Sequence, residues 1–453
     1  MADDQPVEGN LANPELAITH AQTDNADLLI ASTASAGSST NDKLKENTKE
    51  KDDAKDGASK PGFFARAHRL LTIGGAAYVC FLLALLIPVL QRNVIFMNNV
   101  PYPFFARYDS PERYGLAPFK ARNIQVETSD GESIGAWHLL PRTFYIENVE
   151  QYPPSKAFDE DTYDHALQTR PTLIFLHGNA GNRAAPFRVN LISSLSNTLD
   201  MNVLAIDYRG FANSTGVPSE RGLVLDARAA FEWVINRNGG RPDQVGIVGQ
   251  SLGTGVGALL VAQLAEEGIH PRMLTMLSPY SSIPSLLKTY TLFRFLPLLS
   301  PLRALPLVQD TLTSPRFLQT QFPTLSALAS LPRSNPTKIL IVHAQDDTEI
   351  PSIHSSDIFH AVLHADLGME LLNVIPSGLG VAQMEVHTEK FKERGRIIKD
   401  RVEERVVEGW GVVKWFYRSH SDGVAVTWVE TLKGGHDSVG GAEGTISLMG
   451  SIW

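Results

Sequence analysis

The sequence predicts an α/β fold in which a mostly parallel sheet is covered by helices on both faces. From residue 172 onward, short apolar runs alternate with segments of helical pattern. These runs are TLIFL at Thr172, NVLAI at Asn202, VGIVG at Val245, MLTML at Met273, KILIV at Lys338 and VAVTWV at Val424. Continuous apolar runs are typical of strands that are buried on both faces. Between the second and third runs, residues 223–234 carry one apolar helical face, which supplies the crossover that two parallel strands require.

Two further segments complete the predicted domain, which covers residues 95–453. Ile124 to Thr128 and Ile134 to Leu140 flank the turn at residues 129–131, Ser-Asp-Gly, and predict an antiparallel hairpin that opens the sheet. Residues 283–336 break the rhythm with prolines set among leucines and phenylalanines. We interpret this segment as an apolar helical lid over a site, and the alternative is an ordinary helical excursion packed on the core.

The N-terminal part predicts a polar tail followed by a membrane anchor. Residues 1–65 are rich in small and polar residues and should be disordered. The run from Leu70 to Leu90 carries no charge and is long enough to cross the hydrocarbon core as a helix. We therefore predict a transmembrane helix within residues 66–92. A buried core helix fits the uncharged length less well, and a cleaved signal peptide would begin closer to the N-terminus.

The basic residues around this helix predict its orientation. More of them precede the helix than follow it: Lys51, Lys55, Lys60, Arg66 and Arg69 stand before it, and Arg92 and Arg107 after it. By the positive-inside rule, the N-terminus should be cytosolic and the folded domain luminal or extracellular. We expect a single-pass protein of the endoplasmic reticulum membrane.

Composition excludes several other classes of function. A chain of 453 residues can hold one large catalytic domain with appendages. The net charge of -9 comes without a basic stripe, so a nucleic-acid partner is not expected. The single cysteine, Cys80, allows no intrachain disulfide, and no Cys/His cluster has the spacing of a structural zinc site. The chain carries no phosphate loop or dinucleotide fingerprint, so we expect neither a metal nor a cofactor.

The sharpest local motif is Gly-Gln-Ser-Leu-Gly at residues 249–253, with Ser251 at its centre. It follows the predicted strand at Val245 directly and precedes a helix of small residues. A sharp strand-to-helix turn of this kind lifts a serine hydroxyl clear of the sheet and makes it a nucleophile. Serine is a weak nucleophile by itself and needs a histidine base that a carboxylate orients.

Those partners are predicted at the ends of two later strands. The strand at Lys338 ends in HAQDDTEIP, where Asp347 is chosen as the triad acid over Asp346 by its register before Ile350. Asp346 would instead cap the turn. After the last strand comes KGGHD, whose two glycines allow the loop to bring His436 back over the serine as the general base.

An oxyanion hole is predicted from the turn HGNAGN that follows the strand at Thr172. The backbone amides of Asn179 and Leu252 would stabilise the tetrahedral oxyanion, and a plain tight turn is the alternative. We expect His177, at the start of the turn, to brace the loop by hydrogen bonds rather than to take part in proton transfer.

Five motifs in order resemble the α/β-hydrolase superfamily: HGNAGN at His177, DYRGFANSTG at Asp207, GQSLGTGVG at Gly249, HAQDDTEIP at His343 and GGHDSV at Gly434. More narrowly, residues 95–440 and the anchor resemble the membrane-anchored group of lysophosphatidylserine and monoacylglycerol lipases with its fungal relatives. The resemblance implies that Ser251 attacks a carboxylic ester of a lysophospholipid or monoacylglycerol, while Asp347 orients His436.

Two other functions remain open at this point. A protein acyl-thioesterase would use the same triad on cytosolic proteins, and a membrane-tethered scaffold would use the fold without catalysis. The membrane and a lipid ester are the expected partners. Asn213-Ser214-Thr215 is also a glycosylation sequon, which is used only if the domain is luminal.

Overall fold

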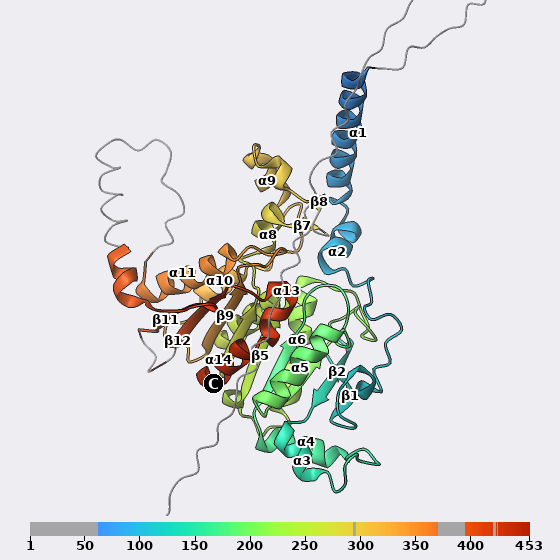
Figure 1. Cartoon of the computed structure of the whole chain (residues 1–453), viewed down its shortest axis with the longest axis vertical. Helices are drawn as coiled ribbons and strands as arrows, with labels where there is room; N and C mark the ends of the chain where they lie inside the picture. Colours follow the sequence, from blue (N-terminus) through green and yellow to red (C-terminus); the bar gives the residue numbers. More distant parts are fainter. Residues whose placement is uncertain (1–61, 293–295, 370–394, 420–422, 424) are drawn as a thin grey trace, which may run out of the picture. The chain divides into compact units, whose positions relative to one another are not determined.

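The computed structural model describes residues 62–292, 296–369, 395–419, 423 and 425–453. The chain divides into two compact units, residues 1–66 and 67–453. The predicted polar tail lies almost entirely outside the described residues, although its last residues already belong to helix α1, which begins at Phe63. Nearly all described elements belong to the second unit (Figure 1).

The predicted anchor is two helices rather than one. Helix α1 (Phe63–Ala84) is long and apolar enough to cross a membrane, and none of its apolar window is buried. Helix α2 (Pro88–Phe96) begins after a break, with a proline in its first turn. Proline lacks the backbone N–H that a continuing helix needs, which explains why the predicted span is interrupted here.

The domain is built on one ten-stranded sheet with the order β1-β2-β4-β3-β5-β6-β9-β12-β11-β10. Its strands are β1 (Ala121–Glu127), β2 (Ser133–Leu139), β3 (Thr172–Leu176), β4 (Asn202–Ile206), β5 (Val245–Gln250), β6 (Met273–Leu277), β9 (Lys338–Ala344), β10 (Glu403–Val407), β11 (Gly411–Tyr417) and β12 (Ala425–Thr431). The central strands from β4 to β12 pair in parallel, whereas both edges pair antiparallel. The sheet is therefore mixed, with the predicted parallel centre and the predicted opening hairpin β1–β2.

Helices cover both faces of the sheet, as expected, and alternate residues of each strand feed two separate cores. On one face, Ile174, Ile247 and Ile341 pack with α6 (Glu220–Ile235), α7 (Leu252–Glu266) and α11 (Ile353–Leu367). On the other face, Phe175 and Val248 pack with α5 (Pro186–Thr198) and α14 (Glu443–Ile452). This alternation follows from the two-residue period of a strand.

The remaining helices are short. They are α3 (Arg142–Asn148) and α4 (Glu160–Thr169) before β3, α8 (Ile283–Thr289), α9 (Pro306–Leu312) and α10 (Thr324–Ala329) within residues 283–336, and α13 (Gly435–Ser438) after β12. Strands β7 (Thr291–Leu292) and β8 (Leu296–Pro297) form a separate two-stranded sheet within residues 283–336. Residues 283–336 are referred to below as the 283–336 segment. Its helices α8 and α9 lie beside the end of α1 and beside α2 (Figure 1).

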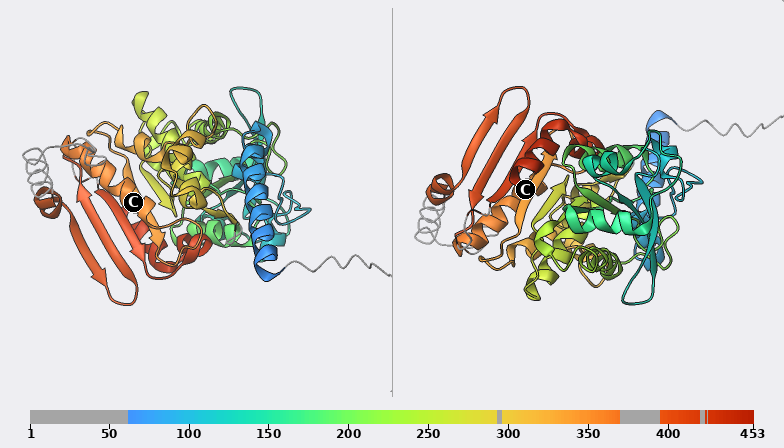
Figure 2. Two further views of the ribbon diagram at one scale, coloured as in Figure 1. Left: turned by 90° about the horizontal axis from the view of Figure 1, so that it is seen from above. Right: turned by 90° about the horizontal axis from the view of Figure 1, so that it is seen from below.

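Strands β10 and β11 extend the sheet beyond β12 and form the outer edge that is visible from above and below (Figure 2). Neither strand is among the apolar runs identified in the sequence. All residues of β10 are exposed, and its sequence EERVV lacks the apolar run by which the other strands were recognised. Charged side chains on an edge strand are a common protection against pairing with another sheet.

Candidate active site

Ser251 lies at the turn between strand β5 and helix α7. Its φ of 50° is in the left-handed region, which is strained for a serine and typical of a nucleophile turn. Neighbouring chains approach this turn closely. A Cβ atom at Gly253 would collide with the carbonyl oxygen of Leu176, and one at Gly249 would collide with the backbone of Gly253. Both flanking positions therefore need glycine for the serine to stand where it does.

Asp347 and His436 come from the ends of neighbouring parallel strands, β9 and β12. His436 Nδ1 lies 2.8 Å from Asp347 Oδ2, and the Asp347 side chain is fully buried. Burial by itself would lower the pKa of His436, but the hydrogen bond and charge of Asp347 outweigh this effect and raise the pKa. A buried carboxylate at Nδ1 is the arrangement that fixes the imidazole tautomer in a catalytic triad.

The neighbouring aspartate, Asp346, has a different role in the structure. Its carboxylate accepts the backbone N–H of Gly435 at 2.8 Å and so fastens the loop that carries His436. Asp347 accepts the backbone N–H groups of Glu349 and Ile350 at 2.8 and 3.0 Å. The structure thus places Asp347, rather than Asp346, against the histidine.

A second buried histidine also contacts the carboxylate predicted to be the triad acid. His343 Nε2 lies 3.3 Å from Asp347 Oδ2 and 2.8 Å from the carbonyl oxygen of Ile350. Burial raises the pKa of the Asp347 carboxyl, but the hydrogen bonds from His343 and His436 lower it well below its usual value. Asp347 is therefore ionised at neutral pH, as an orienting carboxylate must be.

The turn predicted to supply the oxyanion hole is fastened by the segment that follows helix α2. The amides of Ala180, Gly181 and Asn182 donate to the carbonyl oxygens of Phe96, Val100 and Tyr102. Within the described part of the chain, no acceptor is recorded for the amide of Asn179. Leu252 is the first residue of α7, where backbone N–H groups lack intrahelical partners. Both predicted oxyanion donors are thus available to a ligand.

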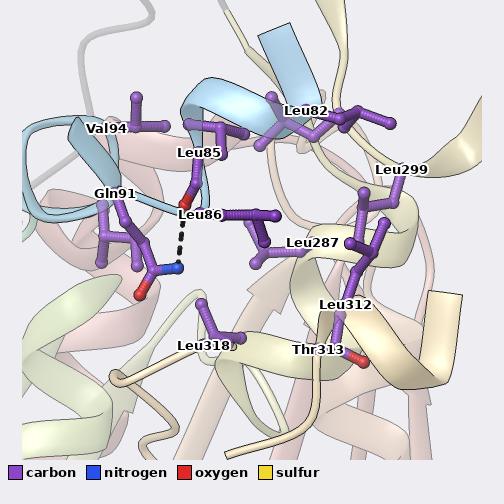
Figure 3. Close-up of a pocket in the computed structure, with 12 residues that line it drawn as sticks. Leu82, Leu85, Leu86, Gln91, Val94, Leu287, Leu299, Leu312, Thr313 and Leu318 are labelled. Atoms are coloured by element: carbon purple, nitrogen blue, oxygen red, sulfur yellow. Dashed lines mark hydrogen bonds between the residues drawn. The ribbon is translucent and has the colours of Figure 1, made fainter. Parts of the chain in front are cut away.

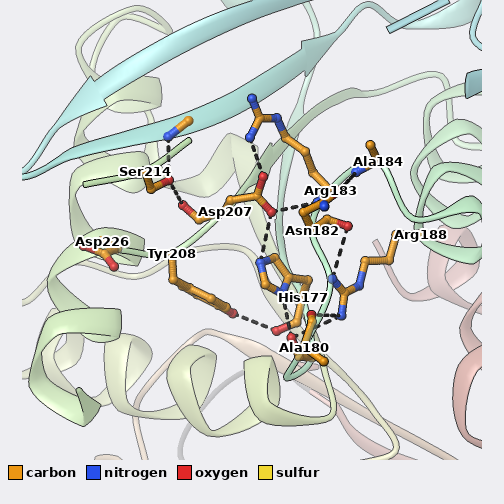
Figure 4. Close-up of polar contacts among 12 residues, drawn as sticks. His177, Ala180, Asn182, Arg183, Ala184, Arg188, Asp207, Tyr208, Ser214 and Asp226 are labelled. Carbon is orange, nitrogen blue, oxygen red and sulfur yellow. Dashed lines mark hydrogen bonds and ion pairs between the residues drawn. The ribbon is translucent and has the colours of Figure 1, made fainter. Parts of the chain in front are cut away.

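Arg188, on helix α5, fastens this turn through its carbonyl oxygens. It is almost fully buried and donates to the carbonyl oxygens of Gly178, Asn179, Ala180 and Asn182 (Figure 4). Burial lowers the pKa of Arg188 to about 10, which still leaves it charged at neutral pH. The guanidinium therefore fixes the carbonyl groups of the turn, so that its amides keep one orientation.

A buried charge network completes the support of the turn (Figure 4). Asp207 accepts the backbone N–H of Arg183 at 2.7 Å and forms an ion pair with its guanidinium. His177 Nε2 lies 3.2 Å from Asp207, and its Nδ1 lies 2.6 Å from the carbonyl oxygen of Gly178. Burial lowers the pKa of His177. His177 thus sits within the support of the loop, in the position that the sequence led us to expect.

Ser251 lines two cavities of different character. The first, which we call the serine cavity, has a volume of about 530 Å³ including its opening, and its walls are mostly apolar residues of α2, α8 and the strand ends. The second, the polar cavity, is lined by His436 and by three charged side chains, Arg188, Glu349 and Asp437. Ser251, Asn179 and Glu349 line both cavities. The structure therefore brings the predicted nucleophile, base and oxyanion donors to one junction.

Sequence reasoning missed two residues of this junction. Glu349 Oε2 lies 3.8 Å from His436 Nε2, and Arg188 donates to carbonyl oxygens of the turn predicted to supply the oxyanion hole. One indication of Arg188 was present in the sequence, because it is the one charged residue in the helical stretch PFRVNLISSL. No such indication was present for Glu349. Asn213, the sequon residue, is exposed and accepts a hydrogen bond from Arg183 through its Oδ1 atom.

Comparison with known proteins agrees with this fold. The family model described as alpha/beta hydrolase fold matches residues 171–287. Lysophosphatidylserine lipase ABHD12 of Rattus norvegicus is 35% identical over 235 residues, which cover 52% of this chain and 56% of that protein. Its namesake of Danio rerio is 35% identical over 204 residues, which cover 45% of this chain and 50% of that protein.

The solved structures that match include an alpha-beta hydrolase from Vibrio vulnificus. It is 14% identical, with a TM-score of 0.46, and covers 80% of this chain and 89% of its own. The chain spans about half the length of the curated relatives it matches. The chain is therefore a protein of the α/β-hydrolase fold, similar over about half its length to lysophosphatidylserine lipases.

Proposed function

We propose that this protein is a membrane-anchored serine hydrolase that cleaves carboxylic esters of lysophospholipids or monoacylglycerols. The observation that carries the proposal is the buried Asp347–His436 pair, 2.8 Å apart, whose histidine lines the polar cavity together with Ser251. The curated relatives are named lysophosphatidylserine lipases, which supports a single-chain lipid ester as substrate. The apolar serine cavity next to Ser251 supports the same class, because it offers an acyl chain a dry environment.

The proposed reaction has two halves. In the first, His436 Nε2 takes the proton of Ser251 as its Oγ attacks the ester carbonyl carbon, and the amides of Asn179 and Leu252 bind the oxyanion. The C–O ester bond then breaks, the alcohol leaves with the proton from His436, and the acyl group stays on Ser251. In the second half, His436 activates a water molecule that attacks the acyl-serine, which releases the fatty acid and restores the free serine.

Labelling and turnover test this proposal together. Membranes that carry the wild-type chain or Ser251→Ala are treated with a fluorophosphonate probe and, separately, with a panel of lysophospholipids, monoacylglycerols and acyl thioesters. We expect labelling and fatty-acid release with the wild type and neither with Ser251→Ala. Release from thioesters alone would show a protein acyl-thioesterase instead, and a wild type that neither labels nor turns over any substrate would show a non-catalytic scaffold.

The orientation in the membrane is a separate proposal. Helix α1 would cross the endoplasmic reticulum membrane once and leave the catalytic domain in the lumen, as its basic N-terminal flank favours. The sequon reports on this directly, because Asn213 is exposed on the domain. We expect a glycosidase-sensitive mass that Asn213→Gln abolishes. A chain of unchanged mass, with the domain digested by protease added to intact microsomes, would place it in the cytosol.

A further inference from the structure

The end of the anchor and the 283–336 segment enclose a second apolar cavity, which we call the leucine cavity (Figure 3). Its volume is about 500 Å³ including its opening. Side chains of α1, the α1–α2 break and α2 form one wall, and side chains of the 283–336 segment form the other. They are Leu82, Leu85, Leu86, Gln91, Val94 and Ile95 on the first wall, and Leu287, Leu298, Leu299, Leu312, Thr313 and Leu318 on the second.

The leucine cavity adjoins the serine cavity, which makes it relevant to catalysis. Val94, Ile95, Leu287 and Leu298 line both cavities. Side chains of α2, of α8 and of Leu298 are therefore common to the apolar walls of both cavities. The polar cavity, which shares Ser251, Asn179 and Glu349 with the serine cavity, also carries Arg188 and Asp437. The three cavities in sequence run from charged to apolar, in the order of the head group, ester and acyl chain of a single-chain lipid.

Hydrogen bonds hold the two walls of the leucine cavity together. Gln91 is almost fully buried and donates to the carbonyl oxygens of Leu85 and Phe317 at 3.1 and 2.9 Å, while its Oε1 accepts the amide of Gln319 at 2.9 Å. The hydroxyl of Tyr78, on α1, donates to the carbonyl oxygen of Leu298 at 2.6 Å. The break between α1 and α2 is thus part of a closed structure rather than a loose linker.

From this geometry we infer that the anchor helix is itself part of the substrate site, and that the leucine cavity binds the distal part of the substrate's acyl chain. The inference rests on the proposed function and adds to it the acyl subsite. Residues Leu82, Leu85 and Leu86 at the end of the anchor would contact the methylenes farthest from the ester. Burial of each methylene contributes about 0.8 kcal/mol, so this wall would set the preference for long chains.

A matched pair of variants tests the inference in the full-length, membrane-embedded protein. Leu86→Trp fills the leucine cavity. Leu83→Trp adds the same side chain three residues earlier, at an exposed position that does not line the cavity. We expect Leu86→Trp to lower the ratio of kcat/KM for an oleoyl over a butanoyl monoacylglycerol by about tenfold, the loss of about two buried methylenes. Leu83→Trp should keep the wild-type ratio. Equal ratios for both variants in an active enzyme would overturn the inference.

A binding experiment decides the inference even if no ester is hydrolysed. A monoacylglycerol with a diazirine at the end of its acyl chain is photocrosslinked to Ser251→Ala, and the adducts are located by mass spectrometry. We expect adducts on Leu86 and Leu318 that excess monooleoylglycerol removes. Adducts confined to the exposed residues Ile73 and Val79, without competition, would overturn it. Competed adducts together with an inactive wild type would reject the proposed hydrolase but retain the acyl site.

Discussion

The two sides of Ser251 are built by different physical means. On the polar side, the Asn179 turn and the triad are held by directional hydrogen bonds between buried groups, such as Arg188 to three successive carbonyl oxygens and Asp347 to His436. On the apolar side, the serine and leucine cavities are lined mostly by leucine, isoleucine and valine. Proton transfer and oxyanion binding depend on sub-ångström placement, whereas acyl-chain binding depends mainly on buried area. In the proposed hydrolase, this difference separates residues that set the rate from residues that select the substrate.

The largest effect should come from the triad acid. Asp347→Asn keeps an acceptor for the amides of Glu349 and Ile350 but allows the wrong tautomer of His436, so kcat should fall by about 10⁴-fold. The measurement is steady-state turnover of a monoacylglycerol in detergent-solubilised protein. Asp346→Asn is the control, because the polar partners of Asp346 within the described residues are the loop backbone at Gly435 and, at longer range, Lys433. If Asp346→Asn were the more damaging change, the assignment of the acid would be wrong.

The buried network behind the oxyanion turn should affect stability more than any surface pair. Asp207→Ala leaves the fully buried Arg183 without its counter-charge, which should cost about 3–5 kcal/mol in the free energy of unfolding. Glu267→Ala removes an ion pair with Arg228 that is partly exposed, and should cost about 1 kcal/mol or less. Urea unfolding of the two variants gives both values.

Equal losses for the two variants would mean that the polar side is not held by its buried charges. The comparison also separates stability from catalysis, since Asp207 does not line either cavity next to Ser251.

Glu349 should tune the pH dependence rather than the maximal rate. The pKa of His436 is lowered by burial but raised more strongly by Asp347, with Glu349 and Asp437 adding to the increase. The general base must be neutral, so activity rises with pH through this raised pKa. Glu349→Gln removes one negative charge, lowers the pKa of His436 and should shift the acidic limb of kcat/KM toward lower pH. Glu404→Gln, on the remote strand β10, should leave the profile in place.

An acidic limb that stays fixed in Glu349→Gln would show that this carboxylate does not act on His436. A shift toward higher pH would contradict the sign of its electrostatic effect.

The sequence predicted those parts of the molecule that depend on short stretches of chain. The central strands carry continuous apolar runs, and the turn at Ser251 is recognised by the two glycines that lie two residues to either side of it. Strand β10 escaped prediction because its exposed sequence EERVV resembles a charged loop. Arg188 and Glu349 were not predicted, because their contacts form only when segments far apart in the sequence meet near Ser251. The leucine cavity depends on contacts between residues more than 200 positions apart, such as Gln91 and Phe317, which no local pattern contains.

The smallest effect should come from the hydrogen bond between helix α1 and the 283–336 segment. Tyr78→Phe keeps the ring and removes only the donor to the carbonyl oxygen of Leu298, so it should destabilise the closed arrangement by about 1 kcal/mol. About fivefold faster amide hydrogen exchange in residues 298–318, in nanodiscs, would report this loss. The exposed Tyr152→Phe serves as the control. Unchanged exchange in Tyr78→Phe would mean that packing of the leucines alone joins the two walls, which would sharpen the contrast with the hydrogen-bonded polar side.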